Sequence, residues 1–503
     1  MDIALLPGER WWGGCVDDGW RMPFPSGHRR RLLDQLANQV QPLLVSNRGR
    51  SVWSEDPYAF TLHDDRLVID EALGRVVVDE GRGDLKGACL AAARRWFAPS
   101  GALPDPLLFT HPQYNTWIEL TYDQAEEPIL RYAEALLRAG YPPGVFMIDD
   151  NWQDAYGTWE FHPGRFRDPR SMIRRLHDLG FKVMLWTCPF VSPDTRTYRA
   201  LRDQGLLLRD TAGVPAIRQW WNGHSAVLDM TNPAACAWLG GKLDGLVSEY
   251  GVDGFKLDAG DFAYYRADDQ ATVPGHPGTH SEAWARFGLR WPLNEYRACW
   301  KLGGQALAQR LRDKLHNWEA DNGLAGCIPN VLAQGLVGYP FTCPDMIGGG
   351  EYLDFHRNSD RLDHELFVRH AQLAALLPMM QFSAAPWRVL PPAMDALCLA
   401  AARLHVEHGG YILDLARHAA VSGEPIVRPL AWEDPSGGHD QVVDQFLLGE
   451  RILVAPVQQR GQRRRSVRFP AGRWLGDDAT LVEGPTVREV DAPLGRLPHW
   501  LRQ

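Results

Sequence analysis

Short apolar runs alternate with segments of helical period from about residue 101 onward. This alternation is typical of parallel βαβ units, in which helices cover a buried sheet. The apolar runs are 107–110, 145–148, 182–186, 254–257, 339–342, 379–382 and 426–430. Segments 123–139 and 169–179 have the helical period, and a glycine follows each of them. The number of runs predicts a (β/α)8 TIM barrel over residues 101–436.

Different patterns flank this region on both sides. Residues 1–100 contain short apolar runs such as 66–70 and 75–79, separated by Gly, Pro and Asp. This pattern predicts an N-terminal domain that resembles a β-sandwich. Strand-like runs return between glycine turns after residue 436, which predicts a small C-terminal β-domain at 437–503.

Composition excludes several classes of partner. The 53 basic and 62 acidic residues give a net charge of −9, which argues against a nucleic-acid surface. The eight cysteines have no Cys-x-x-Cys spacing, so we expect no zinc site and no disulfide framework. The N-terminal segment lacks a secretory signal, and no apolar run is long enough to span a membrane. These features favour a cytoplasmic protein without a membrane partner, a metal or a cofactor, and they leave a homo-oligomer open.

Polar residues directly follow several of the predicted barrel strands. Asp149 and Asp150 follow the run at 145–148, and Asp258 follows the run at 254–257. In a TIM barrel the reacting groups lie at the carboxyl ends of the strands. One such Asp could equally cap the next helix, but repetition over several strand ends favours a functional site.

Hydrolysis of a glycosidic bond would explain a pair of carboxyl groups at such a site, because it needs one to attack and one to protonate the leaving oxygen. The 20 tryptophans also favour a carbohydrate partner, since sugar rings stack on aromatic planes. Asp258 suits the nucleophile, and Lys256 would point the same way and keep it ionised. The partner acid stays open among Asp313, Asp321, Asp345 and Glu351.

Several motifs in the same order resemble glycoside hydrolase family 31, in the branch that includes the α-galactosidase-like myogenesis-regulating glycosidase. The motifs are Arg-Trp-Trp-Gly-Gly at 10–14, Ile-Asp-Asp-Asn-Trp at 148–152, Leu-Trp-Thr-Cys-Pro-Phe-Val at 185–191 and Phe-Lys-Leu-Asp-Ala-Gly-Asp at 255–261. The resemblance implies a retaining α-glycosidase on a TIM barrel, with Asp258 as the nucleophile.

The same resemblance implies roles for further residues. Asp313 is followed five positions later by Trp318, which makes it the general acid and base. Arg312 and Lys314 flank Asp313, and we expect their side chains to point away from it. Asp345 would hydrogen-bond the sugar. The remaining residues expected at the substrate are Asp149, Asp150, Trp186, Trp220, Trp221, Lys256, Trp387, and either Arg310 or Arg312.

The branch resemblance favours terminal α-galactosides as substrates, whose hydroxyl groups Asp149 and Asp150 would bind. It leaves α-glucosides, α-xylosides and N-acetylated sugars open. Two functions of other classes also stay open. One is a non-catalytic carbohydrate-binding protein on the same fold. The other is a metal-dependent aldolase or isomerase, for which His111 and His224 alone supply no ligand set.

Overall fold

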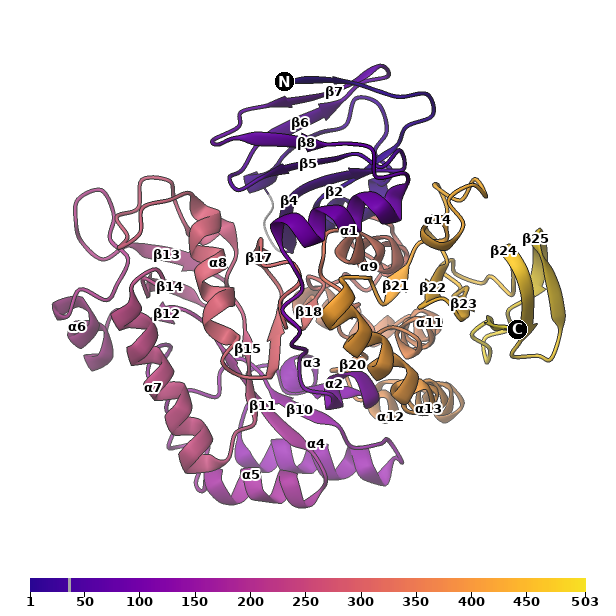
Figure 1. The fold of residues 1–503 in the computed structure, drawn as a ribbon. Helices are drawn as coiled ribbons and strands as arrows, with labels where there is room; N and C mark the ends of the chain where they lie inside the picture. The colour runs from indigo at the N-terminus through magenta and orange to yellow at the C-terminus, as the bar shows by residue number, and fades with distance from the viewer. Residues whose placement is uncertain (35–37) are drawn as a thin grey trace.

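The computed structural model describes residues 1–34 and 38–503, and it contains a barrel, an N-terminal β-domain and a C-terminal β-domain (Figure 1). All strands of the barrel sheet are parallel and follow one another in chain order. They are β9 (Gln113–Asn115), β10 (Val145–Ile148), β11 (Lys182–Thr187), β15 (Gly254–Leu257), β16 (Leu293–Tyr296), β18 (Gln309–Arg310), β19 (Thr342–Cys343) and β20 (Gln381–Phe382). The Met379 N–H donates to the Thr342 carbonyl (3.1 Å), which joins the two edges of the sheet. The predicted (β/α)8 barrel is confirmed.

Helices cover the outside of the barrel because apolar strands must be buried on both faces. They include α4 (Glu126–Arg138), α5 (Pro169–Asp178), α7 (Pro233–Tyr250), α8 (Pro277–Gly288), α9 (Cys327–Leu336), α11 (His364–Ala375) and α13 (Pro392–Ser422). The α5 helix begins where the Asp168 carboxylate accepts from the Ser171 N–H (3.1 Å). The described helices include none that is long and apolar enough to cross a membrane.

Two of the predicted barrel strands are wrong. Residues 107–110 form the short helix α2 (Leu107–Thr110), because Pro106 starts a helical turn and the Asp105 carboxylate accepts from the Leu107 N–H (2.9 Å). The first barrel strand is therefore β9. The run at 426–430 supplies β21 (Val427–Arg428), which pairs antiparallel with β22 (Phe446–Leu448) in the C-terminal sheet.

Two true barrel strands, β16 and β18, lack the apolar pattern that the sequence search relied on. Their buried side chains include Glu295 and Arg310, whose carboxylate oxygen and Nε lie 3.2 Å apart inside the barrel. A paired charge can be buried where an unpaired one cannot. The barrel interior is thus partly polar, and an apolar period could not reveal these strands.

The N-terminal β-domain contains two sheets that share one apolar core. The first is β1 (Asp2–Ala4), β7 (Arg66–Asp70), β6 (Ala59–Leu62) and β3 (Arg29–Arg31); the second is β17 (Cys299–Trp300), β4 (Gln39–Ser46), β5 (Ser51–Ser54) and β8 (Val76–Asp79), with β2 (Trp11–Cys15) beside β4. The predicted β-sandwich is confirmed. Its strand β17 comes from the barrel segment of the chain, so the two parts are joined by backbone pairing.

A six-stranded antiparallel sheet ends the chain (Figure 1). Its strands are β21, β22, β23 (Ile452–Val454), β26 (His499–Arg502), β24 (Arg464–Gly476) and β25 (Leu481–Asp491). This is the predicted C-terminal β-domain. The predicted domain boundaries at residues 100 and 436 stay predictions. Strand β21, which precedes residue 436, already belongs to the C-terminal sheet.

Candidate active site

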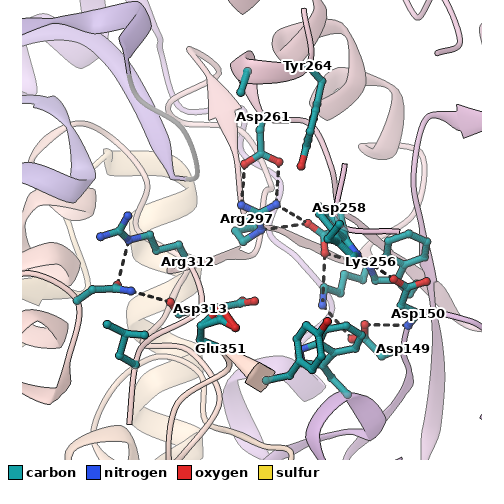
Figure 2. A pocket seen from close by; sticks show the side chains of 17 residues that line it. Asp149, Asp150, Lys256, Asp258, Asp261, Tyr264, Arg297, Arg312, Asp313 and Glu351 are labelled. Carbon is teal, nitrogen blue, oxygen red and sulfur yellow. Dashed lines mark hydrogen bonds and ion pairs between the residues drawn. The ribbon is translucent and has the colours of Figure 1, made fainter. Parts of the chain in front are cut away.

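A cavity of about 500 Å³ opens at the carboxyl ends of the barrel strands (Figure 2). This is the end of a TIM barrel that holds the reacting groups of enzymes with this fold. Its charged and aromatic lining consists of Trp117, Asp149, Asp150, Trp186, Trp221, Lys256, Asp258, Asp261, Tyr264, Arg297, Arg312, Asp313, Glu351 and Tyr352. Both carboxyl groups predicted to be catalytic therefore face the same cavity.

Asp258 directly follows β15, and donors hold both oxygens of its buried carboxylate. Oδ1 accepts from the Ala259 N–H (2.8 Å) and from Arg297 Nε (3.1 Å), and Oδ2 accepts from Trp186 Nε1 (3.0 Å). Lys256 Nζ lies 3.7 Å from Oδ2. A carboxylate held in this way keeps one orientation toward the cavity, which favours attack on a bound substrate.

The charges around Asp258 keep its carboxyl group ionised. Burial alone would raise the pKa of Asp258. The cations of Arg297, Lys256 and Arg310 outweigh burial and hold that pKa well below its usual range. The group is therefore an anion at neutral pH, as a carboxylate nucleophile must be.

Lys256 pairs with two acids of the cavity. Its Nζ lies 2.9 Å from Asp149 Oδ2 as well as 3.7 Å from Asp258 Oδ2. Burial lowers the pKa of Lys256, but the two carboxylates outweigh burial and raise the pKa above its usual value. Lys256 thus stays charged and neutralises both acids, on the same side of β15 as Asp258.

Asp313 lies beside Glu351 in the cavity (Figure 2). Its side chain is 35% exposed, and its Oδ1 accepts from Arg310 Nη1 (2.7 Å). The flanking cations have other partners, as we expected. Arg312 Nε donates to the Asn322 side chain (2.9 Å), and Lys314 is buried with its Nζ 3.1 Å from the Asn330 amide.

Arg310 and Asp345 lie beneath the cavity and do not line it, whereas Arg312, the predicted alternative to Arg310, does line it. A contact of either residue with the sugar stays a prediction. Arg310 is buried and donates to Asp313, Asp345 and Glu295. Asp345 also accepts from the backbone N–H groups of Lys314 (2.7 Å) and Gly350 (2.9 Å). Burial raises the pKa of Asp345 above its usual value, against the opposing effect of Arg310. The pair therefore fixes the loops that carry Asp313 and Glu351.

Only two of the four predicted tryptophan walls line the cavity. Trp186 and Trp221 face it, whereas Trp220 stacks behind Trp186 with ring centroids 6.4 Å apart. Trp387 packs between Tyr132 and Tyr141 on the outside of the barrel, with centroids 5.9 and 5.6 Å away. Trp387 belongs to α12 (Pro386–Val389) and does not line the cavity, so a role as a stacking wall stays a prediction without support from the cavity lining.

Asp150 anchors a hairpin that borders the cavity. The hairpin consists of β13 (Ile217–Trp220) and β14 (Gly223–Val227), and its turn holds Trp221 and Asn222. Asp150 Oδ2 accepts from Trp221 Nε1 (3.0 Å) and Asn222 Nδ2 (2.6 Å), and Oδ1 accepts from the Tyr156 hydroxyl (2.8 Å). Most of its acceptor positions are thus occupied, which leaves little room for a second hydroxyl group.

Replacing Asp150 with Asn should change how stability depends on pH. Burial raises the pKa of Asp150 to about 7 despite its hydrogen bonds. The native state then keeps a proton that the unfolded state loses near pH 4, so ionisation costs up to about 4 kcal/mol of stability as pH rises from 4 to 7. The Tm of wild type should therefore fall relative to that of Asp150→Asn over this range. A difference in Tm that stays constant from pH 4 to 8 would contradict the assignment.

The sequence search missed Arg297, Asp261 and Tyr264 as site residues. Asp261 belongs to a motif that we quoted, but nothing in the motif gave it a role. Arg297 follows β16, a strand that the apolar pattern did not reveal. Among the described residues, no group of three His, Cys, Asp or Glu side chains could hold a metal ion.

Comparison with known proteins places this arrangement among glycosidases. The model of the glycosyl hydrolases family 31 TIM-barrel domain matches residues 109–406, and that of the family 31 C-terminal domain matches residues 423–503. A myogenesis-regulating glycosidase of Mus musculus is 34% identical over 410 residues, which cover 80% of this chain and 57% of the relative. The α-xylosidase XylQ of Lactiplantibacillus pentosus is 27% identical over 516 residues, covering 95% of this chain and 63% of the relative.

Solved structures share the whole fold. A family 31 dextranase of Flavobacterium johnsoniae complexed with glucose superposes with a TM-score of 0.88 at 20% identity, covering 100% of this chain and 66% of the dextranase. A family 31 α-xylosidase from a soil metagenome, complexed with xylose, gives a TM-score of 0.86 at 20% identity and covers 100% and 79% of the two chains. The chain spans less than two thirds of the length of the two sequence relatives above.

Proposed function

Because the chain belongs to glycosyl hydrolase family 31, we propose that it is a retaining α-glycosidase that removes terminal α-galactosides. The observation that carries this proposal is the pair Asp258 and Asp313, which face one cavity in different electrostatic surroundings. Asp258 is held as an anion by three cations. Asp313 is partly exposed and pairs with Arg310, which also pairs with Glu295 and Asp345.

The proposed reaction is a double displacement. Asp258 attacks the anomeric carbon while protonated Asp313 donates its proton to the leaving oxygen. Asp313 then takes a proton from water, which attacks the same carbon and releases the sugar. Two inversions leave the configuration unchanged. The carboxyl groups of a retaining glycosidase lie about 5 to 5.5 Å apart, and we expect that separation in the substrate complex.

The sugar in the cleavage site is the finer part of the proposal. The branch resemblance favours galactose, and the mouse relative is itself named a glycosidase. Asp149 and Asp150 both line the cavity and would accept from adjacent hydroxyl groups, Asp150 through its remaining acceptor position. A second candidate substrate is an α-xyloside, because the relative that aligns over 95% of this chain is named an α-xylosidase.

A panel of nitrophenyl α-glycosides tests the proposal. We expect the highest kcat/KM for the α-galactoside, at least about tenfold above the α-glucoside and α-xyloside, which corresponds to 1.4 kcal/mol of transition-state binding. NMR of the first product formed should show the α-anomer. A β-anomer would exclude the double displacement, and a preference for xylose would replace galactose in the proposal.

The competing function is a carbohydrate-binding protein without activity. It predicts that a galactoside binds, as measured by titration calorimetry, while no glycoside of the panel is hydrolysed. The ionised Asp258 argues against it, because a binding site alone gives no reason to gather cations on one carboxylate.

A further inference from the structure

The guanidinium of Arg297 lies between the carboxylates of Asp258 and Asp261 (Figure 2). Its Nη1 and Nη2 donate to the two oxygens of Asp261, and each donor–acceptor distance is 2.7 Å. On the other side, its Nε and Nη2 lie 3.1 and 3.0 Å from Oδ1 of Asp258. A bidentate ion pair between guanidinium and carboxylate fixes the plane of the guanidinium. Asp261 therefore determines the orientation in which Arg297 meets Asp258.

The two oxygens of Asp258 are not equivalent. Oδ1 receives the Ala259 N–H and two nitrogens of Arg297. Among the described residues, Oδ2 has one donor at hydrogen-bond distance, Trp186 Nε1 (3.0 Å). The cation nearest to Oδ2, Lys256, is 3.7 Å away and lies closer to Asp149. Because three donors occupy Oδ1, Oδ2 is the oxygen with lone pairs left to form a new bond.

We propose that Asp261 is a positioning residue that holds Arg297 against Oδ1 of Asp258. Oδ2 is then the oxygen that attacks the sugar. In the second step, Arg297 stabilises the Asp258 carboxylate as its bond to the sugar breaks. This inference rests on the proposed double displacement. It adds the choice of the attacking oxygen and assigns a role to an acid, Asp261, that does not itself react.

The chemistry follows from where negative charge appears. In the first step, Oδ2 forms a bond to the anomeric carbon, the bond to the leaving oxygen breaks, and that oxygen takes the proton of Asp313. In the second step, water attacks the anomeric carbon and gives its proton to Asp313. The bond to Oδ2 breaks, and its electron pair returns to the Asp258 carboxylate.

Arg297 acts differently in the two steps. The carboxylate loses charge in the first step, so a cation beside it does not favour attack. The carboxylate regains charge in the second step, so donors fixed against Oδ1 favour its departure. A loosened Arg297 should therefore slow release of the sugar from Asp258 more than its attachment.

Asp261→Asn tests this inference. Asn offers one acceptor oxygen and turns its amide N–H₂ toward the other guanidinium nitrogen, so Arg297 loses its fixed plane. With the nitrophenyl glycoside that wild type hydrolyses best, kcat should fall about 10- to 100-fold. KM should fall with it, and stopped-flow measurements should show a burst of about one nitrophenol per protein. Mass spectrometry of acid-quenched protein should show the attached sugar.

Two further variants separate positioning from damage to the fold. Asp261→Glu keeps both acceptor oxygens and should recover part of kcat while the burst shrinks. Glu433→Gln is the matched control, because Glu433 is a carboxylate partner of the buried Arg428 outside the cavity. This control should show wild-type kcat and no burst.

The outcomes distinguish this inference from the proposed function. If wild type hydrolyses a glycoside but Asp261→Asn loses kcat/KM with unchanged KM and no attached sugar, the inference is overturned and Asp261 is only structural. Unchanged kinetics in Asp261→Asn overturn it as well. If wild type hydrolyses no α-glycoside, the proposed function itself fails.

Discussion

Asp258→Ala is expected to lower kcat/KM for the preferred α-glycoside by about 10⁴-fold or more, with little change in substrate binding. Removal of a nucleophile abolishes the covalent route, and what remains is catalysis by the surrounding site. Asp258 is suited to attack because Trp186 and Arg297 both orient its carboxylate toward the cavity. Initial rates over a range of substrate concentrations, together with titration calorimetry of the product sugar, measure the two quantities separately.

Asp253→Ala is the matched control for that variant. Asp253 immediately precedes β15, so the same strand places it at the opposite end of the barrel from Asp258. Its carboxylate accepts from the Val183 N–H (2.7 Å) and contacts His177 Nε2 (2.8 Å). Loss of these contacts should lower Tm and leave kcat within about twofold of wild type, because most substitutions away from a site affect stability alone.

Azide provides a second measurement on Asp258→Ala. A small anion in the space of the missing carboxylate can attack the anomeric carbon directly. One inversion then gives the β-glycosyl azide, whereas wild type gives the α-sugar. Turnover of Asp258→Ala in the absence of azide within about tenfold of wild type would show that another residue is the nucleophile. Formation of the α-glycosyl azide by this variant would show the same.

The fold was predictable from sequence where strands carry apolar side chains and not where they carry paired charges. The runs at 145–148, 182–186 and 254–257 became β10, β11 and β15 because their buried side chains are mostly apolar. Strands β16 and β18 escaped notice because they bury Glu295 and Arg310 as an ion pair. This ion pair joins two separate strands, so no local sequence pattern predicts it.

The candidate site shows the same division. Asp149, Asp150 and Asp258 directly follow apolar strands, and the structure places all three in the cavity. Arg297 follows a strand that the sequence did not reveal, so its contact with Asp258 could not be foreseen. Arg310 and Asp345 were expected at the sugar, but both are buried outside the cavity lining. A sequence motif does not distinguish a side chain that lines a cavity from one buried beneath it.

Asp313→Ala should reveal the general acid through its dependence on the leaving group. Without the acid, an α-linked disaccharide must lose an unprotonated sugar oxygen, and kcat/KM should fall about 10²- to 10⁴-fold. A nitrophenyl leaving group departs without a proton, so the same variant should lose far less on the aryl glycoside in the step that attaches the sugar. Azide should raise the rate and give the α-glycosyl azide, because it replaces the water that Asp313 can no longer activate.

Glu351→Gln decides between the two carboxyl groups that lie together in the cavity. Glu351 is the alternative candidate for the general acid, because burial and the negative charge of Asp313 raise the pKa of Glu351, as an acid catalyst requires. Asp313 has the ion pair with Arg310, which Arg310 shares with Asp345 and Glu295. If Asp313 is the acid, Glu351→Gln should slow disaccharide and aryl glycoside by similar factors. A loss confined to the disaccharide in Glu351→Gln, and absent from Asp313→Ala, would transfer the role to Glu351.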